Sequence, residues 1–328
     1  MSRGLAVTLA VAAVALLPAT ARGDGLPLPV DDAGPTGVTS PDGSTRYVTL
    51  PAASGAVVAK ISTGSGTVLR SRALVGGFTI PVVALDSTPG GLSHDGSTLA
   101  VIRPRAGFPR SKTTLAFLDT QNLAMRGLYT LKGDFSFDAL SPDGRTAYLI
   151  QYVDRTDPTK YRVRALQTAT GGLSPRPIVD PHESADEMNG FPATRTTSPD
   201  GRWAYTLYDG AQDGRPFVHA LDTKDGKAKC IDLPALGQDV YSLHLRATGG
   251  TLGIIGPKRE VASVDLTSYK VSVPAQRAAA PAPGAARRRA DPDSSAPAGL
   301  IAAIGVVLAL AGAGLTLRRR RRGAVTPA

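Results

Sequence analysis

Three side chains that can bind an anion or exchange a proton occupy equivalent places in a repeated motif. Asp138, Arg195 and His244 each stand three residues before a Ser, or the Ala that replaces it, at the start of a recurring turn. If the strands that precede these turns are the innermost strands of repeated sheets, the three side chains line one axis. Together they could bind an anion or perform acid–base chemistry. The alternative role is a set of hydrogen bonds between neighbouring sheets.

Other charged side chains gather in the longer segments between predicted strands. The first group is Arg103, Arg105, Arg110 and Lys112, and the second is His182, Glu183, Asp186 and Glu187. The second group contains carboxylates and an imidazole, but their spacing matches no zinc or EF-hand signature, so we expect no metal site. A solvated loop is the simpler interpretation of this group. From them we take Arg103, Arg105, Glu183 and Asp186 as binding candidates.

The sequence contains no recognised catalytic motif. A nucleophile elbow, a phosphate-binding loop and HExxH are all absent, so we assign no catalytic residue and expect no cofactor. Cys230 is the only cysteine, which excludes an intramolecular disulfide. It lies in an alternating, strand-like segment, where we expect its thiol to be buried; pairing with another chain is the alternative.

A repeated turn motif predicts the β-strands on which these residues lie. Four copies of the turn stand at 40–43, 93–96, 141–144 and 198–201, three of them reading Ser-Pro-Asp-Gly, and a degenerate copy stands at 247–250. Asp-Gly between two strand-like runs predicts a β-hairpin, because Gly accepts the positive φ that such a turn needs. We therefore interpret Asp42, Asp95, Asp143 and Asp200 as turn formers rather than metal ligands or catalytic carboxylates.

The third unit shows the whole repeat. Residues 135–140 lead into the turn and 146–151 lead out, 161–166 alternate, and 173–179 close four antiparallel strands in about 50 residues. Units of this kind predict an all-β β-propeller of five four-stranded blades, in which each sheet is shielded by its neighbours. Residues 75–89 are long enough to add strands of a sixth blade. On these turns and strands, residues 34–274 resemble bacterial propellers of the TolB-like and YVTN-like group, a resemblance that implies a fold and no particular site.

Strand order divides the connections between two faces of such a propeller. The Asp-Gly turns and the connections between third and fourth strands are short, and they form what we call the turn face. The connections at 103–112, 151–160, 180–191 and 209–215 are long and charged, and they form the long-loop face. Because binding residues concentrate on loops held by a rigid scaffold, we expect the long-loop face to bind a ligand.

The net charge of +10 does not belong to the predicted propeller. Segment 24–276 holds 26 basic and 25 acidic residues, which argues against a nucleic-acid partner. Much of the excess follows an uncharged run at 298–317, which at about 1.5 Å per residue matches the ~30 Å core of a bilayer. The cluster is Arg318, Arg319, Arg320, Arg321 and Arg322, and such a cluster favours the cytoplasmic side.

The opposite end has the pattern of a signal peptide. Arg3 precedes an apolar run, and Ala19-Thr20-Ala21 is a small-residue cleavage site. We divide the chain into a signal peptide (1–21), an N-terminal lead (22–33), a propeller (34–275), a Pro/Ala/Arg-rich linker (276–297), a transmembrane helix (298–317) and a basic cytoplasmic tail (318–328).

This organisation predicts a single-pass protein of the cell membrane whose propeller lies outside the cytoplasm. Its end also resembles the sorting tail of sortase substrates, but residues 295–299 read Ser-Ala-Pro-Ala-Gly in place of Leu-Pro-x-Thr-Gly, which favours the membrane anchor. The function we expect is a non-enzymatic binding module for a protein, glycan or cell-wall ligand. The rival is an extracytoplasmic hydrolase or lyase with its site at the channel mouth.

Overall fold

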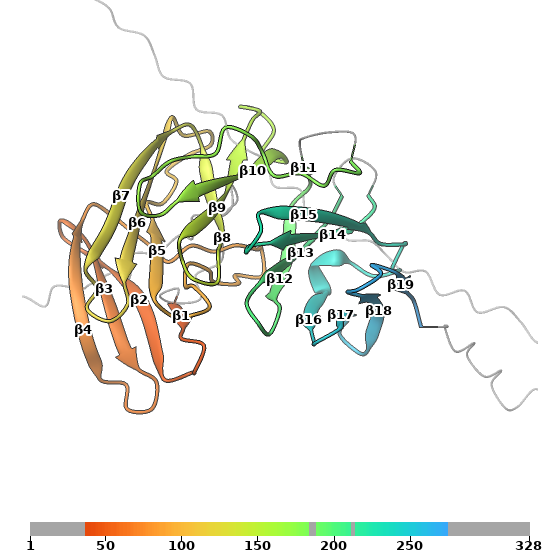
Figure 1. The fold of residues 1–328 in the computed structure, drawn as a ribbon, viewed down its shortest axis with the longest axis horizontal. Coiled ribbons are helices and arrows are strands. Elements are labelled where there is room, and N and C mark those ends of the chain that lie inside the picture. The colour runs from red at the N-terminus through yellow and green to blue at the C-terminus, as the bar shows by residue number, and fades with distance from the viewer. Residues whose placement is uncertain (1–36, 184–187, 211–213, 275–328) are drawn as a thin grey trace, which may run out of the picture. The chain divides into compact units, whose positions relative to one another are not determined.

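The computed structural model describes residues 37–183, 188–210 and 214–274, which form nineteen β-strands and one short 3-10 helix, η1 (Val240–Ser242) (Figure 1). The predicted signal peptide, lead, linker, transmembrane helix and arginine tail lie outside these residues, as does Asp186. None of the described helices is long and apolar enough to cross a membrane.

The strands form five antiparallel sheets that follow one another in chain order (Figure 1). We call them blades 1 to 5. Blade 1 contains β1 (Gly37–Thr39), β2 (Thr45–Ala52), β3 (Gly55–Ser62) and β4 (Val68–Val75), and blade 2 contains β5 (Thr98–Ile102), β6 (Lys112–Asp119) and β7 (Met125–Lys132). Blade 3 contains β8 (Phe135–Leu140), β9 (Thr146–Tyr152), β10 (Lys160–Gln167) and β11 (Met188–Asn189). Blade 4 contains β12 (Pro192–Thr197), β13 (Trp203–Tyr208), β14 (Phe217–Asp222) and β15 (Lys227–Asp232), and blade 5 contains β16 (His244–Ala247), β17 (Thr251–Ile255), β18 (Glu260–Asp265) and β19 (Val271–Ser272).

Blade 2 has three regular strands, and an irregular segment takes the innermost place. Leu92 forms a β-bridge with Leu99 of β5. The amide of Ala100 donates to the carbonyl oxygen of Gly91 at 2.6 Å. The amide of Ser93 donates to the carbonyl oxygen of Thr98 at 3.0 Å. The five-blade prediction is therefore confirmed, with this strand position filled by a bridged segment.

Residues 75–89, which left room for a sixth blade, form no sheet of their own within the described chain. They make a small hairpin closed by the Val82–Pro89 bridge, and its tip reaches the start of β12 in blade 4. There the amide of Leu85 donates to the carbonyl oxygen of Pro192 at 2.8 Å. The hairpin thus crosses from blade 2 to blade 4 at the long-loop end of the innermost strands.

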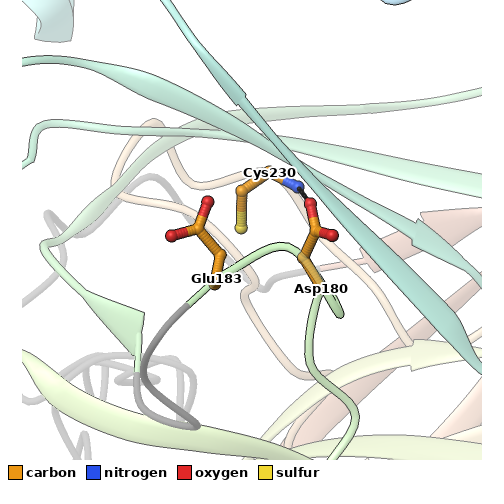
Figure 2. Close-up of side chains that lie close together, drawn as sticks. All are labelled: Asp180, Glu183 and Cys230. Atoms are coloured by element: carbon orange, nitrogen blue, oxygen red, sulfur yellow. Dashed lines mark hydrogen bonds between the residues drawn. The ribbon is translucent and has the colours of Figure 1, made fainter.

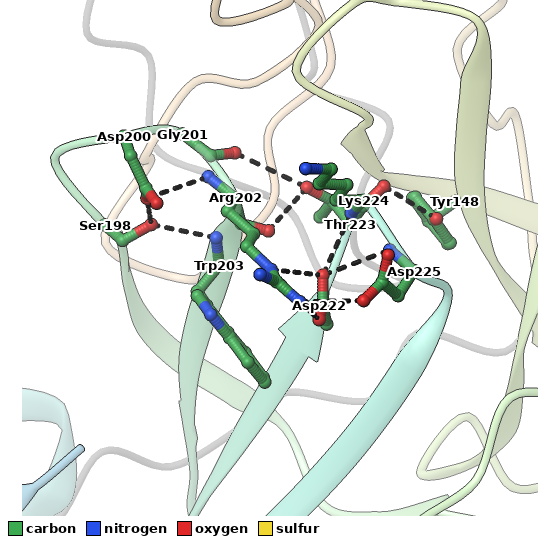
Figure 3. Close-up of polar contacts among 10 residues, drawn as sticks. All are labelled: Tyr148, Ser198, Asp200, Gly201, Arg202, Trp203, Asp222, Thr223, Lys224 and Asp225. Carbon is green, nitrogen blue, oxygen red and sulfur yellow. Dashed lines mark hydrogen bonds and ion pairs between the residues drawn. The ribbon is translucent and has the colours of Figure 1, made fainter. Parts of the chain in front are cut away.

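The repeated turn has the same hydrogen bonds in blades 1 to 4. In blade 4, Ser198 Oγ donates to Asp200 Oδ1 at 2.5 Å and accepts from the amide of Trp203 at 2.8 Å, while Gly201 has φ +71° (Figure 3). Asp200 also accepts from the amide of Arg202 at 3.1 Å. The aspartates hold the turn, as predicted, and the hydrogen bond from Ser40 is the largest cause that lowers the pKa of Asp42 to about 2.

A threonine that follows the third strand locks each of these turns. In blade 4, Thr223 Oγ1 donates to the carbonyl oxygen of Arg202 at 2.7 Å (Figure 3). Thr63, Thr120 and Thr168 donate to the carbonyl oxygen of the turn glycine in blades 1, 2 and 3. The innermost, second and third strands are therefore fastened to one another at the turn face.

Neighbouring blades are joined by buried apolar clusters, one at each junction from blade 1 to blade 5. The cluster between blades 2 and 3 contains Phe117 and Phe137, and the cluster between blades 4 and 5 contains Leu207 and Ile254. The other two join blades 1 and 2 and blades 3 and 4. Among the described residues, no such cluster joins blade 5 to blade 1.

Candidate functional site

The structure brings Asp138 and Arg195 together between the innermost strands of blades 3 and 4. The Arg195 guanidinium donates to both the main-chain oxygen and Oδ1 of Asp138, and its Nε donates to Thr206 Oγ1 at 2.9 Å. Each side chain is only 5% exposed. Asp138 Oδ2 is buried without a hydrogen-bond partner. This arrangement is the inter-blade hydrogen bonding that we considered as the alternative to a catalytic or anion-binding role.

His244 does not join this pair. It is exposed on β16, and Leu245, not His244, occupies the position that matches Arg195. The reason is that Ala247 pairs with Leu252 immediately before the turn, as Thr197 pairs with Ala204, so Thr248 rather than Ala247 replaces the motif serine. A shift of one residue turns a strand side chain to the opposite face of the sheet.

A cavity of about 430 Å³ lies between the innermost strands and turns of blades 1 to 4. The Asp138–Arg195 pair forms part of its wall, together with Phe137 and Val83. Thr39, Thr196, Thr197 and His94 add polar groups to the lining. A second hollow of about 530 Å³ lies between the turns of blades 1 and 2, beside Asp95 and Lys60. Both hollows include turn-face residues, whereas the sequence predicted a binding site on the long-loop face and, as the rival, an enzyme site at the channel mouth.

The long loop 103–112 is held rigidly by charges that sequence reasoning did not connect. Arg105 Nη2 lies 2.7 Å from Asp134 Oδ1, and the amide of Arg110 donates to Asp134 Oδ2 at 2.9 Å. The rings of Phe108 and Tyr152 meet edge to face at 5.4 Å, and the Arg105 guanidinium lies 5.0 Å from the Tyr152 ring centre. Arg105 is thus a buried anchor of the loop, and Asp134 is its partner.

Arg103 stands at the exposed start of the same loop. Its Nη2 donates to the carbonyl oxygen of Val75 at 3.3 Å, and its guanidinium covers the Phe78 ring at 5.3 Å. Most of its hydrogen-bonding capacity therefore remains available at the surface, in contrast to Arg105.

Glu183 lies near Asp180 and Cys230, and one ligand atom from each of the three side chains falls within 4.8 Å of the others (Figure 2). Asp180 is already satisfied by donors: Oδ1 accepts from the amide of His182 at 3.0 Å, and Oδ2 accepts from the amide of Cys230 at 2.8 Å and lies 3.0 Å from Lys229 Nζ. Although burial opposes it, these donors lower the pKa of Asp180.

The thiol of Cys230 is the third side chain of this group. Burial raises its pKa to about 12, so it remains protonated at neutral pH. Lys229 pairs with the same Asp180 carboxylate, 3.0 Å from its Oδ2. Asp180 is therefore an anchor that fastens the loop before β11 to β15. The candidate Asp186 lies outside the described residues.

His219 is a buried imidazole that sequence reasoning missed. It is 2% exposed on β14, its Nδ1 lies 3.9 Å from Cys230 Sγ, and its Nε2 has no hydrogen-bond partner. Burial lowers its pKa to about 4, so the ring is neutral at physiological pH. The sequence gives no signal for His219, because it is one residue of a strand-like segment. Its imidazole is buried only when blade 3 packs on blade 4.

The sheets and their packing define the chain as a β-propeller, as predicted. No family model and no curated protein matches the chain. Among solved structures, a putative TolB from Agrobacterium tumefaciens is 13% identical, with a TM-score of 0.40 over 73% of this chain and 79% of that one.

Two other similar solved structures are an enzyme and a propeller domain. An oligogalacturonate lyase in complex with manganese is 9% identical, with a TM-score of 0.45 over 73% of this chain and 63% of that one. The β-propeller domain of Cps50 (Swd1) from Myceliophteria thermophila is 11% identical, with a TM-score of 0.42 over 72% of this chain and 66% of that one. The chain thus spans less than two thirds of each.

Proposed function

We propose that this chain is an extracytoplasmic, membrane-anchored β-propeller that acts as a binding module through its long-loop face. The observation that carries the proposal is the rigid loop 103–112, whose arginines Arg105 and Arg110 share the buried carboxylate of Asp134. A loop ordered before binding loses less conformational entropy on binding, so more of the contact energy appears as affinity.

The chemistry of this loop favours a polar or acidic partner. Arg103 and Lys112 are exposed at its two ends, and Arg105 and Phe108 hold the loop between them. Guanidinium and ammonium groups at the rim of a surface attract carboxylates and phosphates, and they contribute chiefly to orientation and on-rate. We infer a protein, glycan or cell-wall polymer that carries such groups.

The location belongs to the same proposal and rests on sequence alone. The leader pattern at 1–21 would send the chain across the membrane, the uncharged run at 298–317 would anchor it, and Arg318 to Arg322 would stay inside. The membrane is therefore its first partner.

The test uses the full chain in its own membrane. Charge reversal by Arg103→Glu with Lys112→Glu should weaken crosslinking to purified cell-wall polymer and to envelope proteins at least tenfold. The matched control is Arg145→Glu, which reverses a charge on the turn face where the side chain is 86% exposed. Equal crosslinking by wild type and the double variant would refute the long-loop face. Loss of binding in Arg145→Glu alone would move the site to the turn face.

A second candidate is the hydrolase or lyase at the channel. It is favoured by the cavity of about 430 Å³ and by Asp138 Oδ2, a buried carboxylate oxygen without a partner in its wall. Turnover of polysaccharide substrates by wild type, abolished by Asp138→Asn in a variant that unfolds at the same temperature, would establish this function in place of the first.

A further inference from the structure

Cys230 and His219 form a pair of potential metal ligands on blade 4. They are direct partners on the antiparallel strands β14 and β15, so their side chains project from the same side of the sheet. His219 Nδ1 lies 3.9 Å from Cys230 Sγ. We propose that these two side chains and the carboxylate of Glu183 bind a zinc ion. The inference is independent of the proposed polymer ligand and of the charged loop 103–112.

A tight turn brings Glu183 to this pair. Asp180 Oδ2 accepts from the amide of Cys230 at 2.8 Å, which fastens the turn beside β15. The carbonyl oxygen of Asp180 accepts from the amide of Glu183 at 3.1 Å and closes the turn. One ligand atom from each of Asp180, Glu183 and Cys230 lies within 4.8 Å of the others, and Figure 2 shows the two carboxylates on either side of the thiol.

The imidazole of His219 is the independent observation that points to a ligand. The side chain is 2% exposed, and among the described residues its Nε2 has no hydrogen-bond partner. Its Nδ1 faces the thiol at a distance that is long for a hydrogen bond. Buried polar groups in native proteins normally have firm partners, and a bound ion is one explanation for an exception.

The distances and the donor atoms fit zinc. Zinc binds a thiolate at about 2.3 Å and an imidazole at about 2.0 Å, so the sulfur and nitrogen of a tetrahedral site lie about 3.5 Å apart. The observed 3.9 Å is close enough that a small side-chain rotation suffices. A sulfur and an imidazole ligand favour zinc over calcium or magnesium, which prefer oxygen. Glu183 is exposed, so the ion can enter from solvent and retain a water as its fourth ligand.

The charges of the site balance a divalent cation. Binding displaces the thiol proton to solvent, and the thiolate and the Glu183 carboxylate then carry two negative charges. Asp180 adds no third charge, because Lys229 Nζ lies 3.0 Å from its Oδ2. Asp180 is therefore a positioning residue, and the ion fastens the turn at 180–183 to the two outer strands of blade 4. Sequence spacing does not reveal this set, since its members come from two strands and from a loop of the preceding blade.

The experiment titrates the full chain, purified in detergent without a metal-binding tag, with Co²⁺ and then with Zn²⁺. A thiolate-to-cobalt absorption band identifies Cys230, because the chain has no other cysteine. We expect one Co²⁺ per chain at micromolar concentration, displaced by Zn²⁺. Glu183→Gln alters an exposed ligand, leaves the thiol in place and should weaken binding at least tenfold. The matched control is Glu260→Gln, which alters an exposed carboxylate on blade 5 and should leave the affinity unchanged.

Three results would overturn the proposal. A wild type without the thiolate band would show that Cys230 does not bind the metal. Equal affinity of wild type and Glu183→Gln would remove Glu183 from the ligand set. Zinc binding that is unchanged in Cys230→Ser, measured by isothermal titration calorimetry, would place the ion elsewhere in the chain. Near-ultraviolet circular dichroism of each variant verifies that the blades remain folded.

Discussion

The hydroxyl of Tyr148 in β9 donates a hydrogen bond of 2.8 Å to the carbonyl oxygen of Thr223, which follows β14 in the next blade (Figure 3). Thr223 in turn locks the Asp-Gly turn of its own blade through the carbonyl oxygen of Arg202. One phenol therefore ties the second strand of blade 3 to the turn of blade 4. Tyr47 makes the equivalent contact with Thr120 between blades 1 and 2, at 3.5 Å.

Replacing this phenol should weaken the junction between blades 3 and 4. Tyr148→Phe removes the donor and leaves the Thr223 carbonyl buried without it, so we expect a loss of about 1–2 kcal/mol in the free energy of unfolding. Urea denaturation followed by tryptophan fluorescence measures the change, because Trp203 lies in blade 4. Tyr269→Phe is the control, since the Tyr269 hydroxyl makes no hydrogen bond in the described structure. An equal loss in both variants would contradict the assignment.

The same hydroxyl predicts a loss of stability in alkali. Burial raises the pKa of Tyr148 from 10.0 to about 12, so the folded chain holds this proton at a pH where the unfolded chain has released it. The stabilisation is complete below pH 10 and is lost as the pH rises towards 12. The slope of unfolding free energy against pH over this range should be smaller in Tyr148→Phe than in wild type. Identical slopes would mean that the hydroxyl is not buried.

Alanine substitutions at two turn glycines should distinguish the cost of a left-handed backbone from the cost of a steric clash. Gly43 and Gly201 both have positive φ, +72° and +71°, but a Cβ at Gly43 meets open space whereas one at Gly201 collides with His94. Gly43→Ala should cost about 1–2 kcal/mol through the left-handed backbone alone. Gly201→Ala should cost clearly more, and thermal unfolding measures both. A smaller effect at Gly201 would show that His94 moves aside freely.

The Asp138–Arg195 pair should behave as a coupled buried unit. Arg195→Met leaves the Asp138 carboxylate buried without its counter-charge, and we expect a loss of about 3–5 kcal/mol in the free energy of unfolding. The double variant Asp138→Asn with Arg195→Met should recover a large part of this loss. A double-mutant cycle in urea measures the coupling. Additive losses would mean that the two groups do not interact.

The lowered pKa of Asp180 predicts that acid reduces the free energy of unfolding. Its pKa lies below the ordinary 3.8 because hydrogen bonds from His182, Cys230 and Lys229 outweigh the effect of burial. The stabilisation is complete above pH 4 and is lost as the pH falls through the lower folded pKa. Asp180→Asn should flatten the dependence of stability on pH in this range. Urea denaturation at several pH values measures the slope, and an unchanged slope in Asp180→Asn would contradict the assignment.

The features that could be predicted from the sequence are those with local causes. The turns are closed by hydrogen bonds between residues two to five apart, as between Ser198, Asp200 and Trp203, so the motif itself specifies them. Strand β8 (Phe135–Leu140) has the bounds that the sequence predicts for the segment leading into the third turn. The degenerate fifth turn misled the alignment because it is shorter, and His244 was assigned to the wrong face.

By itself, the sequence determined the repeat, its turns and the all-β class, because each depends on contacts within one blade or one turn. The tertiary structure alone decided which charges meet. Asp138 and Arg195 are 57 residues apart, Arg105 and Asp134 are 29 apart, and Cys230 donates to a carboxylate 50 residues earlier. These pairs form because packing one blade on the next removes water from both partners, and no local pattern reports which side chains that packing brings together.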